Sequence, residues 1–544
     1  QAVGLGACRR CRAAGRPAGP DVSLVRRGGP LASGRAMAQP DVVVVGGGIA
    51  GLTVALSAAE AGLRVVVLER QPRLGGRARG WKDPTTGDPV SIGPHVVTDP
   101  DYLHFFKLLR RIGTFDKLAW QPPGHFMTWM EGEREISIDQ PTFLPAPFSW
   151  LPALYKDPLL KLRDVHASLP VIAFTLKCSE EELLALDGES GLDFLRRFEV
   201  TENMIDHFWR FACHAICNVP LEEVSACALI RFMQRLVGTS PRLARIGFAN
   251  CGLGDLLTPA KERLEELGAE VRLRTEVLGF EGDDEVTGVV LEGEVLRPRV
   301  GVVVTLPASD LHAFLPERWH QRAPLPQLAG LKPCAYLCTY IWFDRKLTDK
   351  QFWARTFTRE GLNCDFYDFS NIFPGWTKPS FIGTNCIDST AASSGGQRDH
   401  AMNGMSDDEV FERTLAEIRE NIPLARDAKV LHWTVNRVPQ AIHRPVVGTE
   451  RLRPRGGATG VRGLFLAGDY CATQFPCSME SAACGGYQCA EAVLSAAGRP
   501  RALVEAREPL DGAATLLGRL LGQERLRPLL LGLSRLNGGQ MAKL

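Results

Sequence analysis

Three glycines and one glutamate near the start of the chain have the spacing of a site for a nucleotide diphosphate. Gly46, Gly48 and Gly51 occur in the run GGGIAG, and Glu69 ends the next apolar run. In such a site the first glycine allows a sharp turn, the second lets the diphosphate approach the backbone, and the third lets a helix pack closely on a strand. The acid accepts hydrogen bonds from a ribose. These residues predict a dinucleotide cofactor.

The surrounding segments predict the elements that would hold these residues. Val42 to Val45 is a short apolar run typical of a buried parallel strand, residues 52–61 have the composition of a helix, and residues 64–68 form a second strand. The N-terminus of that helix would offer N–H groups and a partial positive charge to phosphates. The glycine spacing is a weak signal when it stands alone, but a complete strand, turn, helix, strand and acid is specific.

A second pair of glycines follows the predicted ribose acid. The run LGGRA contains Gly76 and Arg77, and it resembles the segment with which large FAD enzymes return across the diphosphate. Arg77 would then contact an anion, whereas the alternative is an arginine on a surface loop. Arg70, which adjoins Glu69, is also counted among the cofactor-binding residues. The resemblance favours FAD over NAD.

The far end of the chain carries a matching motif. The run VRGLFLAGD ends in Gly468 and Asp469, and a helix is expected to begin near Met479 and Glu480. In the FAD enzymes that this pattern resembles, the aspartate holds the ribityl chain and the helix points its N-terminus at the electron-rich end of the flavin. A helix N-terminus stabilises an anion by up to about 2 kcal/mol when partly buried. Taken alone, Asp469 would be interpreted as a turn or helix-capping acid.

These pieces predict an α/β fold with a Rossmann-type FAD-binding domain, built on a doubly wound parallel sheet and interleaved with an α+β substrate domain. A strand before Val277, which would contact the adenine, and a buried strand after Gly301 fit the same domain. The expected FAD-binding residues are 37–135, 250–310 and 430–500, and the expected substrate domain comprises a helical cap (136–249) and a β layer (311–429).

Five stretches carry a more specific resemblance. They are GWKD from Gly80, GPH ending at His95, LPAP from Leu144, NVPLEEVS from Asn218, and the segment from Gly468 to Ala482. From about Asp41 to Leu494 the chain resembles the phytoene and ζ-carotene desaturases of plants and cyanobacteria, and the hydroxysqualene dehydroxylases of bacteria, all within the FAD-dependent amine-oxidase superfamily.

The resemblance implies FAD, a C30 or C40 isoprenoid substrate and a quinone or other electron acceptor. The expected reaction is desaturation by transfer of a hydride to the flavin, which needs no catalytic triad or metal because the cofactor supplies the reactive atom. His95, Met479 and Glu480 are the candidate catalytic residues, although His95 could equally be a structural histidine. Ser481 stands where the desaturases usually have glycine, so the exact substrate stays open.

A flavin amine oxidase acting on a small amine is the alternative. Such enzymes often link FAD to a cysteine shortly before the final motif, or frame the flavin with two aromatic rings. No cysteine lies between Trp433 and Arg462, so a link there is excluded and noncovalent FAD is expected. Trp433 and Tyr470 could form the aromatic pair, or each could pack in the core.

Composition limits the other classes of function. The net charge is +1 and no basic stripe with interleaved aromatics occurs, so nucleic acid is not an expected partner. The fifteen cysteines are an odd number without paired zinc half-sites, which predicts no metal and free thiols in a reducing compartment. No apolar run reaches the length of about 18 residues that a transmembrane helix needs.

The first 36 residues, expected to lack a fixed structure, contain seven arginines and one acid. That balance fits a transit peptide, which would indicate a plastid, or translated sequence upstream of a start at Met37, which would leave a cytoplasmic enzyme. The stretch Phe143 to Leu160 and the amphipathic tail 501–544, in which leucines and arginines alternate, predict binding to a membrane surface. A helix docked on the protein's own surface is the alternative for the tail.

Overall fold

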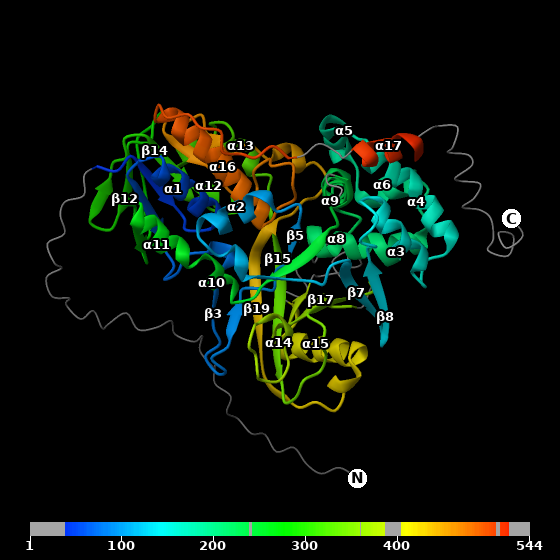
Figure 1. Cartoon of the computed structure of the whole chain (residues 1–544). Helices are drawn as coiled ribbons and strands as arrows, with labels where there is room; N and C mark the ends of the chain where they lie inside the picture. Colours follow the sequence, from blue (N-terminus) through cyan, green and yellow to red (C-terminus); the bar gives the residue numbers. More distant parts are fainter. Residues whose placement is uncertain (1–38, 239–241, 359–360, 387–403, 508–511, 522–544) are drawn as a thin grey trace, which may run out of the picture. The chain divides into compact units, whose positions relative to one another are not determined.

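A mixed six-stranded sheet collects strands from four distant parts of the chain (Figure 1). The computed structural model describes residues 39–238, 242–358, 361–386, 404–507 and 512–521, so the N-terminal extension and most of the C-terminal tail lie outside the described residues. The strand order is β10-β2-β1-β14-β21-β20, parallel except for the pairing of β20 with β21. The strands are β1 (Val42–Val45), β2 (Val65–Glu69), β10 (Glu270–Leu273), β14 (Gly301–Val304), β20 (Gly457–Ala458) and β21 (Leu464–Leu466).

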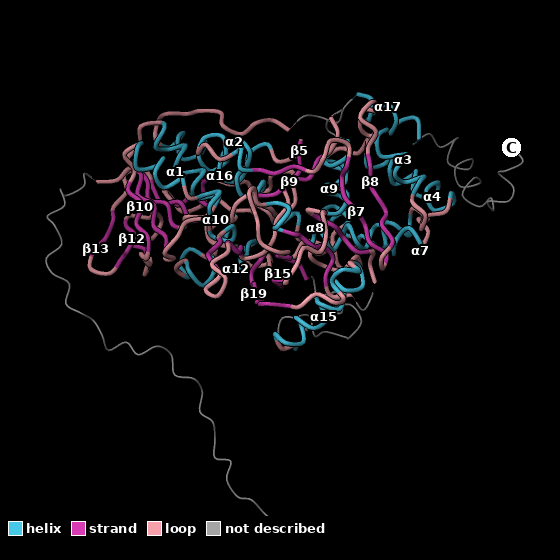
Figure 2. The backbone as a smooth tube through the Cα atoms, turned by 60° about the horizontal axis from the view of Figure 1, so that its bottom comes forward, coloured by secondary structure: helices cyan, strands magenta, loops and turns pink. Residues whose placement is uncertain are grey.

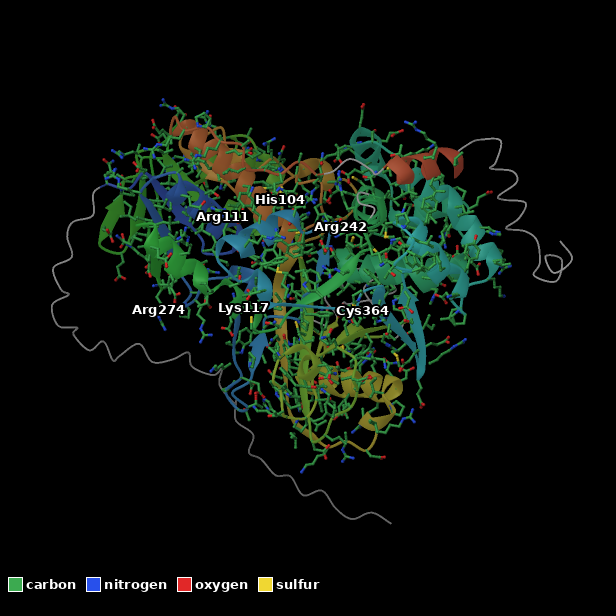
Figure 3. The ribbon with its side chains drawn as sticks, in the orientation of Figure 1. His104, Arg111, Lys117, Arg242, Arg274 and Cys364 are labelled. Atoms are coloured by element: carbon green, nitrogen blue, oxygen red, sulfur yellow. The ribbon has the colours of Figure 1, made fainter. Side chains whose placement is uncertain are left out.

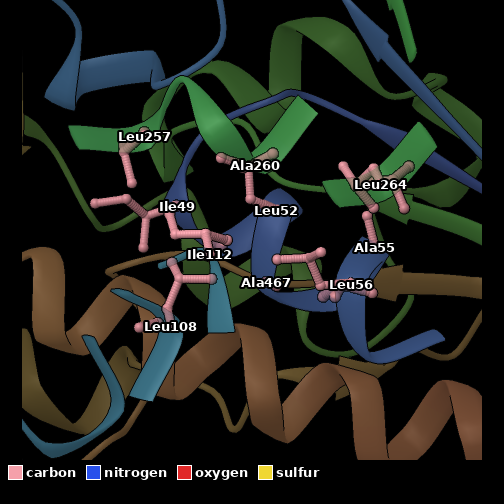
Figure 4. Close-up of a cluster of buried hydrophobic side chains, with 14 of the residues drawn as sticks. Ile49, Leu52, Ala55, Leu56, Leu108, Ile112, Leu257, Ala260, Leu264 and Ala467 are labelled. Atoms are coloured by element: carbon pink, nitrogen blue, oxygen red, sulfur yellow. The ribbon is translucent and has the colours of Figure 1, made fainter. Parts of the chain in front are cut away.

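Both faces of this sheet are covered, which explains the unbroken apolar run of β1. Val42 and Val44 face a cluster with α1 (Ile49–Glu60), α2 (Leu103–Arg111), α11 (Pro259–Glu266) and α16 (Met479–Ala496), part of which is drawn in Figure 4. Val43 and Val45 face the opposite cluster, which includes α12 (Ala308–Phe314), α13 (Leu325–Leu328) and a small sheet. The small sheet comprises β11 (Gly279–Glu281), β12 (Gly288–Leu291) and β13 (Glu294–Leu296).

A second sheet of seven strands has the order β19-β15-β18-β17-β16-β7-β8. One of its faces packs against α15 (Asp407–Asn421), which Figure 2 labels together with β15 and β19. The other face carries aromatic side chains that cluster with residues of β9 (Arg245–Ala249). Its strands are β7 (His125–Glu131), β8 (Arg134–Asp139), β15 (Pro333–Phe343), β16 (Phe352–Arg355), β17 (Asn363–Asp368), β18 (Phe381–Cys386) and β19 (Val430–His443).

Helices between residues 151 and 238 form a third layer around their own apolar cluster. Helix α17 (Gly512–Leu521) packs against this layer, with Gly518 next to Leu176 and the end of α4. The helices of the layer are α3 (Leu151–Lys156), α4 (Leu162–Thr175), α5 (Glu180–Ala185), α6 (Gly191–Arg197), α7 (Glu202–Met204), α8 (Arg210–Cys217) and α9 (Ala226–Gly238).

The remaining short elements connect these layers. They are β3 (Gly80–Lys82), β4 (Pro89–Ser91), β5 (Val97–Asp99), β6 (Leu118–Trp120), α10 (Leu253–Leu257) and α14 (Phe369–Ile372). The predicted α/β class is confirmed. The described residues from Gln39 onward cluster as one compact unit, and the proposed domain boundaries within it stay a prediction.

Candidate functional site

The two glycine pairs lie side by side at the end of β1. Gly48 bridges Gly75, and the Gly75 N–H donates to the carbonyl of Gly47 at 2.8 Å. Gly46 has a φ of +106°, a conformation that favours glycine, and a Cβ at Gly51 would stand 2.0 Å from the Gly46 oxygen. Gly48 caps α1 with no side-chain hydrogen bond. The turn and the close helix packing therefore both require glycine, as the sequence predicts.

Glu69 fastens the end of β2 to this turn. One carboxylate oxygen accepts from the Gly47 N–H and the other accepts from the Gln71 N–H, each at 2.8 Å. A carboxylate has about four acceptor positions, so Glu69 keeps capacity for further donors such as ribose hydroxyls. Val277 is buried in the apolar cluster that continues from β2, whereas Arg70 is exposed next to Glu69.

Arg77 and Asp469 form an ion pair between residues 392 apart in the sequence, with a guanidinium nitrogen 2.5 Å from Oδ1. Arg77 also donates to the Ala441 carbonyl at 2.9 Å, and the Cys477 thiol donates to the other Asp469 oxygen at 2.8 Å. Burial opposes ionisation of Asp469, but the charge of Arg77 and the hydrogen bonds outweigh it and hold its pKa below the usual value. The predicted residues Gly76, Arg77, Gly468 and Asp469 thus belong to one place.

Helix α16 begins beside this pair. Ser478 caps it by accepting from the Ser481 N–H at 3.1 Å, and Met479 packs in the apolar cluster under the first sheet. Glu480 is fully buried, and its oxygens accept from His104 at 2.7 Å, from the Phe105 N–H at 2.9 Å and from Arg507 at 2.8 Å (Figure 3 labels His104). These contacts tie α2 and the segment at Arg507 to the start of α16.

His95 follows a segment that lies on the aromatic face of the seven-stranded sheet. Its Nδ1 is 2.7 Å from the Gly93 carbonyl oxygen, and burial lowers its pKa. A Cβ at Gly93 would stand 2.4 Å from the Tyr336 hydroxyl, so the segment contacts the sheet directly. The amide of Asn385 donates to the Pro94 carbonyl at 3.3 Å.

Asp365 and Asn385 are paired neighbours in β17 and β18 that the sequence did not single out. Asp365 Oδ2 accepts from Tyr367 at 3.2 Å, whereas Asp365 Oδ1 and Asn385 Oδ1 are buried without a hydrogen-bond partner. Burial raises the pKa of Asp365 to about 7. Together they form a polar group on the aromatic face of the second sheet. The aromatic residues of these strands do not indicate that such a polar group is present.

A cavity adjoins the Arg77–Asp469 pair between the first sheet and the end of β19. It is lined by Arg77, Pro307, Ala308, Ser309, Leu331, Pro333, Gln440, Ile442, His443, Asp469 and Tyr470. Two predicted site residues and several unpredicted ones therefore share one enclosed space. The strand and loop ends that surround it come from five separate parts of the chain.

The comparison with known families identifies this arrangement. A family model described as flavin-containing amine oxidoreductase matches residues 49–494. The chain belongs to this family. The match begins at the first residue of α1, just after β1 and the glycine turn, and ends within α16, so it includes the Gly468–Asp469 motif and the strands of both sheets from β2 onward.

Curated relatives extend along most of the chain. The 15-cis-phytoene desaturase of Narcissus pseudonarcissus is 27% identical over 84% of this chain and 79% of its own length. The 15-cis-phytoene desaturase of Synechococcus elongatus is 25% identical over 86% of this chain and its whole length, and a probable ζ-carotene desaturase of the same organism is 25% identical over 84% of this chain.

Solved structures share the fold. An oxidoreductase of Methanosarcina mazei matches with a TM-score of 0.60 at 16% identity, covering 82% of this chain and 98% of its own. A putrescine oxidase variant matches with a TM-score of 0.61 at 16% identity over 85% of this chain and 99% of its own. At this identity the likeness concerns the fold alone.

The family implies a flavin, and the residues present fit one. A Cβ at Gly48 would meet only the Gly76 Cα, at 3.8 Å, so the two glycines leave an open cradle beside the N-terminus of α1. The chain is therefore a flavin-dependent oxidoreductase of this family. Glu69 and the Arg77–Asp469 pair add the hydroxyl acceptors and the cation that a flavin nucleotide needs.

We expect Asp365→Asn to stabilise the protein at neutral and alkaline pH. The folded pKa is raised above the ordinary 3.8, so the folded state binds more protons and wild-type stability falls as the pH rises from about 4 to about 7. The asparagine variant lacks this loss. Between pH 4 and about pH 7, the difference between the melting temperatures of Asp365→Asn and the wild type should grow. From pH 7 to pH 8.5 it should stay constant.

Asp41→Asn provides the control of opposite sign. Hydrogen bonds from Arg64 and the charge of Arg299 outweigh burial and lower the Asp41 pKa, so this variant should lose stability at neutral pH and approach the wild type in acid. A constant difference between Asp365→Asn and the wild type at every pH would contradict the raised pKa.

Proposed function

We propose that this protein is an FAD-dependent dehydrogenase that desaturates a long isoprenoid on a membrane surface. The observation that carries the proposal is the similarity to phytoene and ζ-carotene desaturases, which covers 84–86% of this chain. The acceptor that reoxidises the flavin is a quinone or a compound of similar potential.

FAD would lie along the edge where the parallel strands end. Gly46, Gly48, Gly51 and Gly76 make room for the diphosphate, and Arg77 supplies its counter-charge. Glu69 accepts from the ribose, with Arg70 beside it, and Val277 contacts the adenine. Asp469 with Gly468 holds the ribityl chain, and Met479 lies at the helix N-terminus that faces the flavin ring.

The flavin supplies the hydride acceptor, and the protein's own residues orient the substrate and exclude water. His95 lies on the segment between the cofactor site and the aromatic sheet, which supports a role in positioning the reacting carbon. The contacts of Glu480 support a positioning role for this residue, because all of them hold α16 in place and none points to a substrate.

Noncovalent FAD predicts that acid precipitation releases all yellow colour into the supernatant. Gly48→Val should fold with the wild-type circular dichroism but purify without flavin, because its side chain fills the cradle. Gly188→Val is the matched control, since a Cβ there meets nothing within 4 Å, and it should keep a full flavin complement. Colour that stays in the pellet would show a covalent link instead.

The surroundings of Trp433 weigh against an amine oxidase with an aromatic frame. Trp433 stacks on Phe411 of α15 at 4.6 Å, whereas Tyr470 is buried in a cluster of the first sheet and lines the cavity beside Arg77 and Asp469. The two rings belong to different clusters. This observation favours the isoprenoid over a small amine.

The substrate class can be tested by anaerobic reduction of the bound flavin. We expect loss of absorbance near 450 nm when the holoenzyme meets liposomes that contain phytoene or ζ-carotene, and recovery when a quinone is added. Putrescine and cyclohexylamine serve as the amine controls and should leave the flavin oxidised. Reduction by the amines alone would refute the isoprenoid proposal.

Exposed apolar side chains support membrane binding. Phe143 is 82% exposed before α3 and Leu516 is 58% exposed on α17. Tyr155 on α3, Leu162 on α4 and Leu520 on α17 are exposed as well, and Figure 1 shows these helices in one layer. Helix α17 packs on α4, as expected if the tail docks on the protein's own surface. Leu516 and Leu520 nevertheless stay exposed to solvent. None of the described helices has both the length and the apolar character to span a bilayer.

Flotation with anionic liposomes tests this surface. The double variant Leu516→Glu, Leu520→Glu and a chain truncated after Pro509 should float at least about threefold less than the wild type, because charged side chains and loss of the helix both remove inserted apolar area. Leu431→Glu is the matched control, since Leu431 is also 58% exposed but lies on β19. Equal flotation of all four proteins would exclude α17 as the anchor.

A further inference from the structure

His443 ends β19 with both of its ring nitrogens unsatisfied. The residue is 5% exposed, and neither Nδ1 nor Nε2 has a hydrogen-bond partner. Among the histidines that the structure describes, no other one has both ring nitrogens buried without a hydrogen-bond partner. His104 and His207, which are equally buried, each have a carboxylate partner at 2.7–2.8 Å.

The imidazole lines the cavity that also contains Arg77 and Asp469. The preceding residues fix this end of β19, because the Ala441 carbonyl accepts from Arg77 at 2.9 Å and the Gln440 amide donates to Asp310 at 2.8 Å. Contacts with Arg77 and Asp310 therefore fix the backbone just before His443, next to the candidate cofactor site. Pro333 pairs with it across the sheet edge.

His443 is a neutral side chain at physiological pH. Burial, followed by the charges of Arg453 and Arg77, lowers its pKa to about 4 despite the opposing charges of Glu450 and Asp469. A neutral imidazole offers one N–H donor and one nitrogen acceptor. Such a pair matches hydroxyl, imide and ring-nitrogen groups, all of which occur in a flavin.

A histidine kept only for packing would not normally leave two polar atoms unpaired, because each such atom costs about 1–3 kcal/mol of folding free energy. We infer that His443 is a cofactor-positioning residue that hydrogen-bonds to polar groups of the flavin in this cavity. The inference rests on the proposed FAD site and adds a residue to it. Its hydrogen bonds form with the ligand and are absent from the protein's own packing.

This role predicts opposite effects on stability and on binding. His443→Phe keeps a planar ring, although a slightly larger one, and removes both orphan nitrogens, so the melting temperature of the apoprotein should stay unchanged or rise. The Kd for FAD, measured by quenching of flavin fluorescence, should rise about tenfold because a flavin polar group loses its partner. His443→Gln, which retains a donor and an acceptor, should bind FAD within about threefold of the wild type.

His207→Phe is the matched control, because it removes a buried histidine whose ring bonds to Asp157 in the helical layer. It should lower the melting temperature and leave the Kd for FAD unchanged. If His443→Phe fails to fold, His443→Leu replaces it in the same two measurements.

Two outcomes would overturn the inference. One is an unchanged Kd for FAD in the Phe or Leu variant, and the other is a loss of affinity in the Gln variant as large as in the Phe variant. Either result, with wild-type protein that binds FAD, leaves the proposed function intact. Wild-type apoprotein that does not bind FAD would instead refute the proposed function.

Discussion

The contact between Arg77, which is partly exposed, and the buried Asp469 is the interaction on which the geometry of the site depends. Removing Arg77 would leave the Asp469 carboxylate buried without its cation, which is destabilising. The pair forms only when the turn after β2 and the end of β21 reach the same edge of the first sheet. The parallel order β2-β1-β14-β21 ensures this, because the carboxyl ends of parallel strands meet at one edge.

The two faces of the second sheet have different surroundings. One face is closed by α15 and serves stability, whereas the aromatic face meets the segment that leads to His95. Asp365 places a carboxyl group on that aromatic face, and burial raises the pKa of this carboxyl to about 7. This face is therefore mostly aromatic, with a polar group formed by Asp365, Asn385 and the Tyr367 hydroxyl.

The features that the sequence predicts are those encoded by neighbours along the chain. The turn at Gly46, the position of Glu69 at the end of β2 and the start of α16 each depend on a local strand, turn and helix pattern, so the sequence locates them. The environment of Glu480 could not be predicted in this way, because its partners His104 and Arg507 belong to distant segments. The same holds for Asp365 and His443, since a sequence pattern shows which face a residue occupies but gives no information on whether its polar atoms find partners across that face.

The order of strands in the first sheet also governs how the chain folds as it leaves the ribosome. Strand β1 is made early, but its second neighbour β14 follows only at Gly301 and β21 only at Leu464. At 5–20 residues per second, roughly 13–50 s of translation separate Val45 from Gly301, where the strand that closes the edge of β1 begins. During this interval a valine-rich strand has an open edge, which is a template for aggregation. The late synthesis of β14 and β21 therefore leaves the nascent chain more exposed to edge-to-edge pairing than the finished fold is.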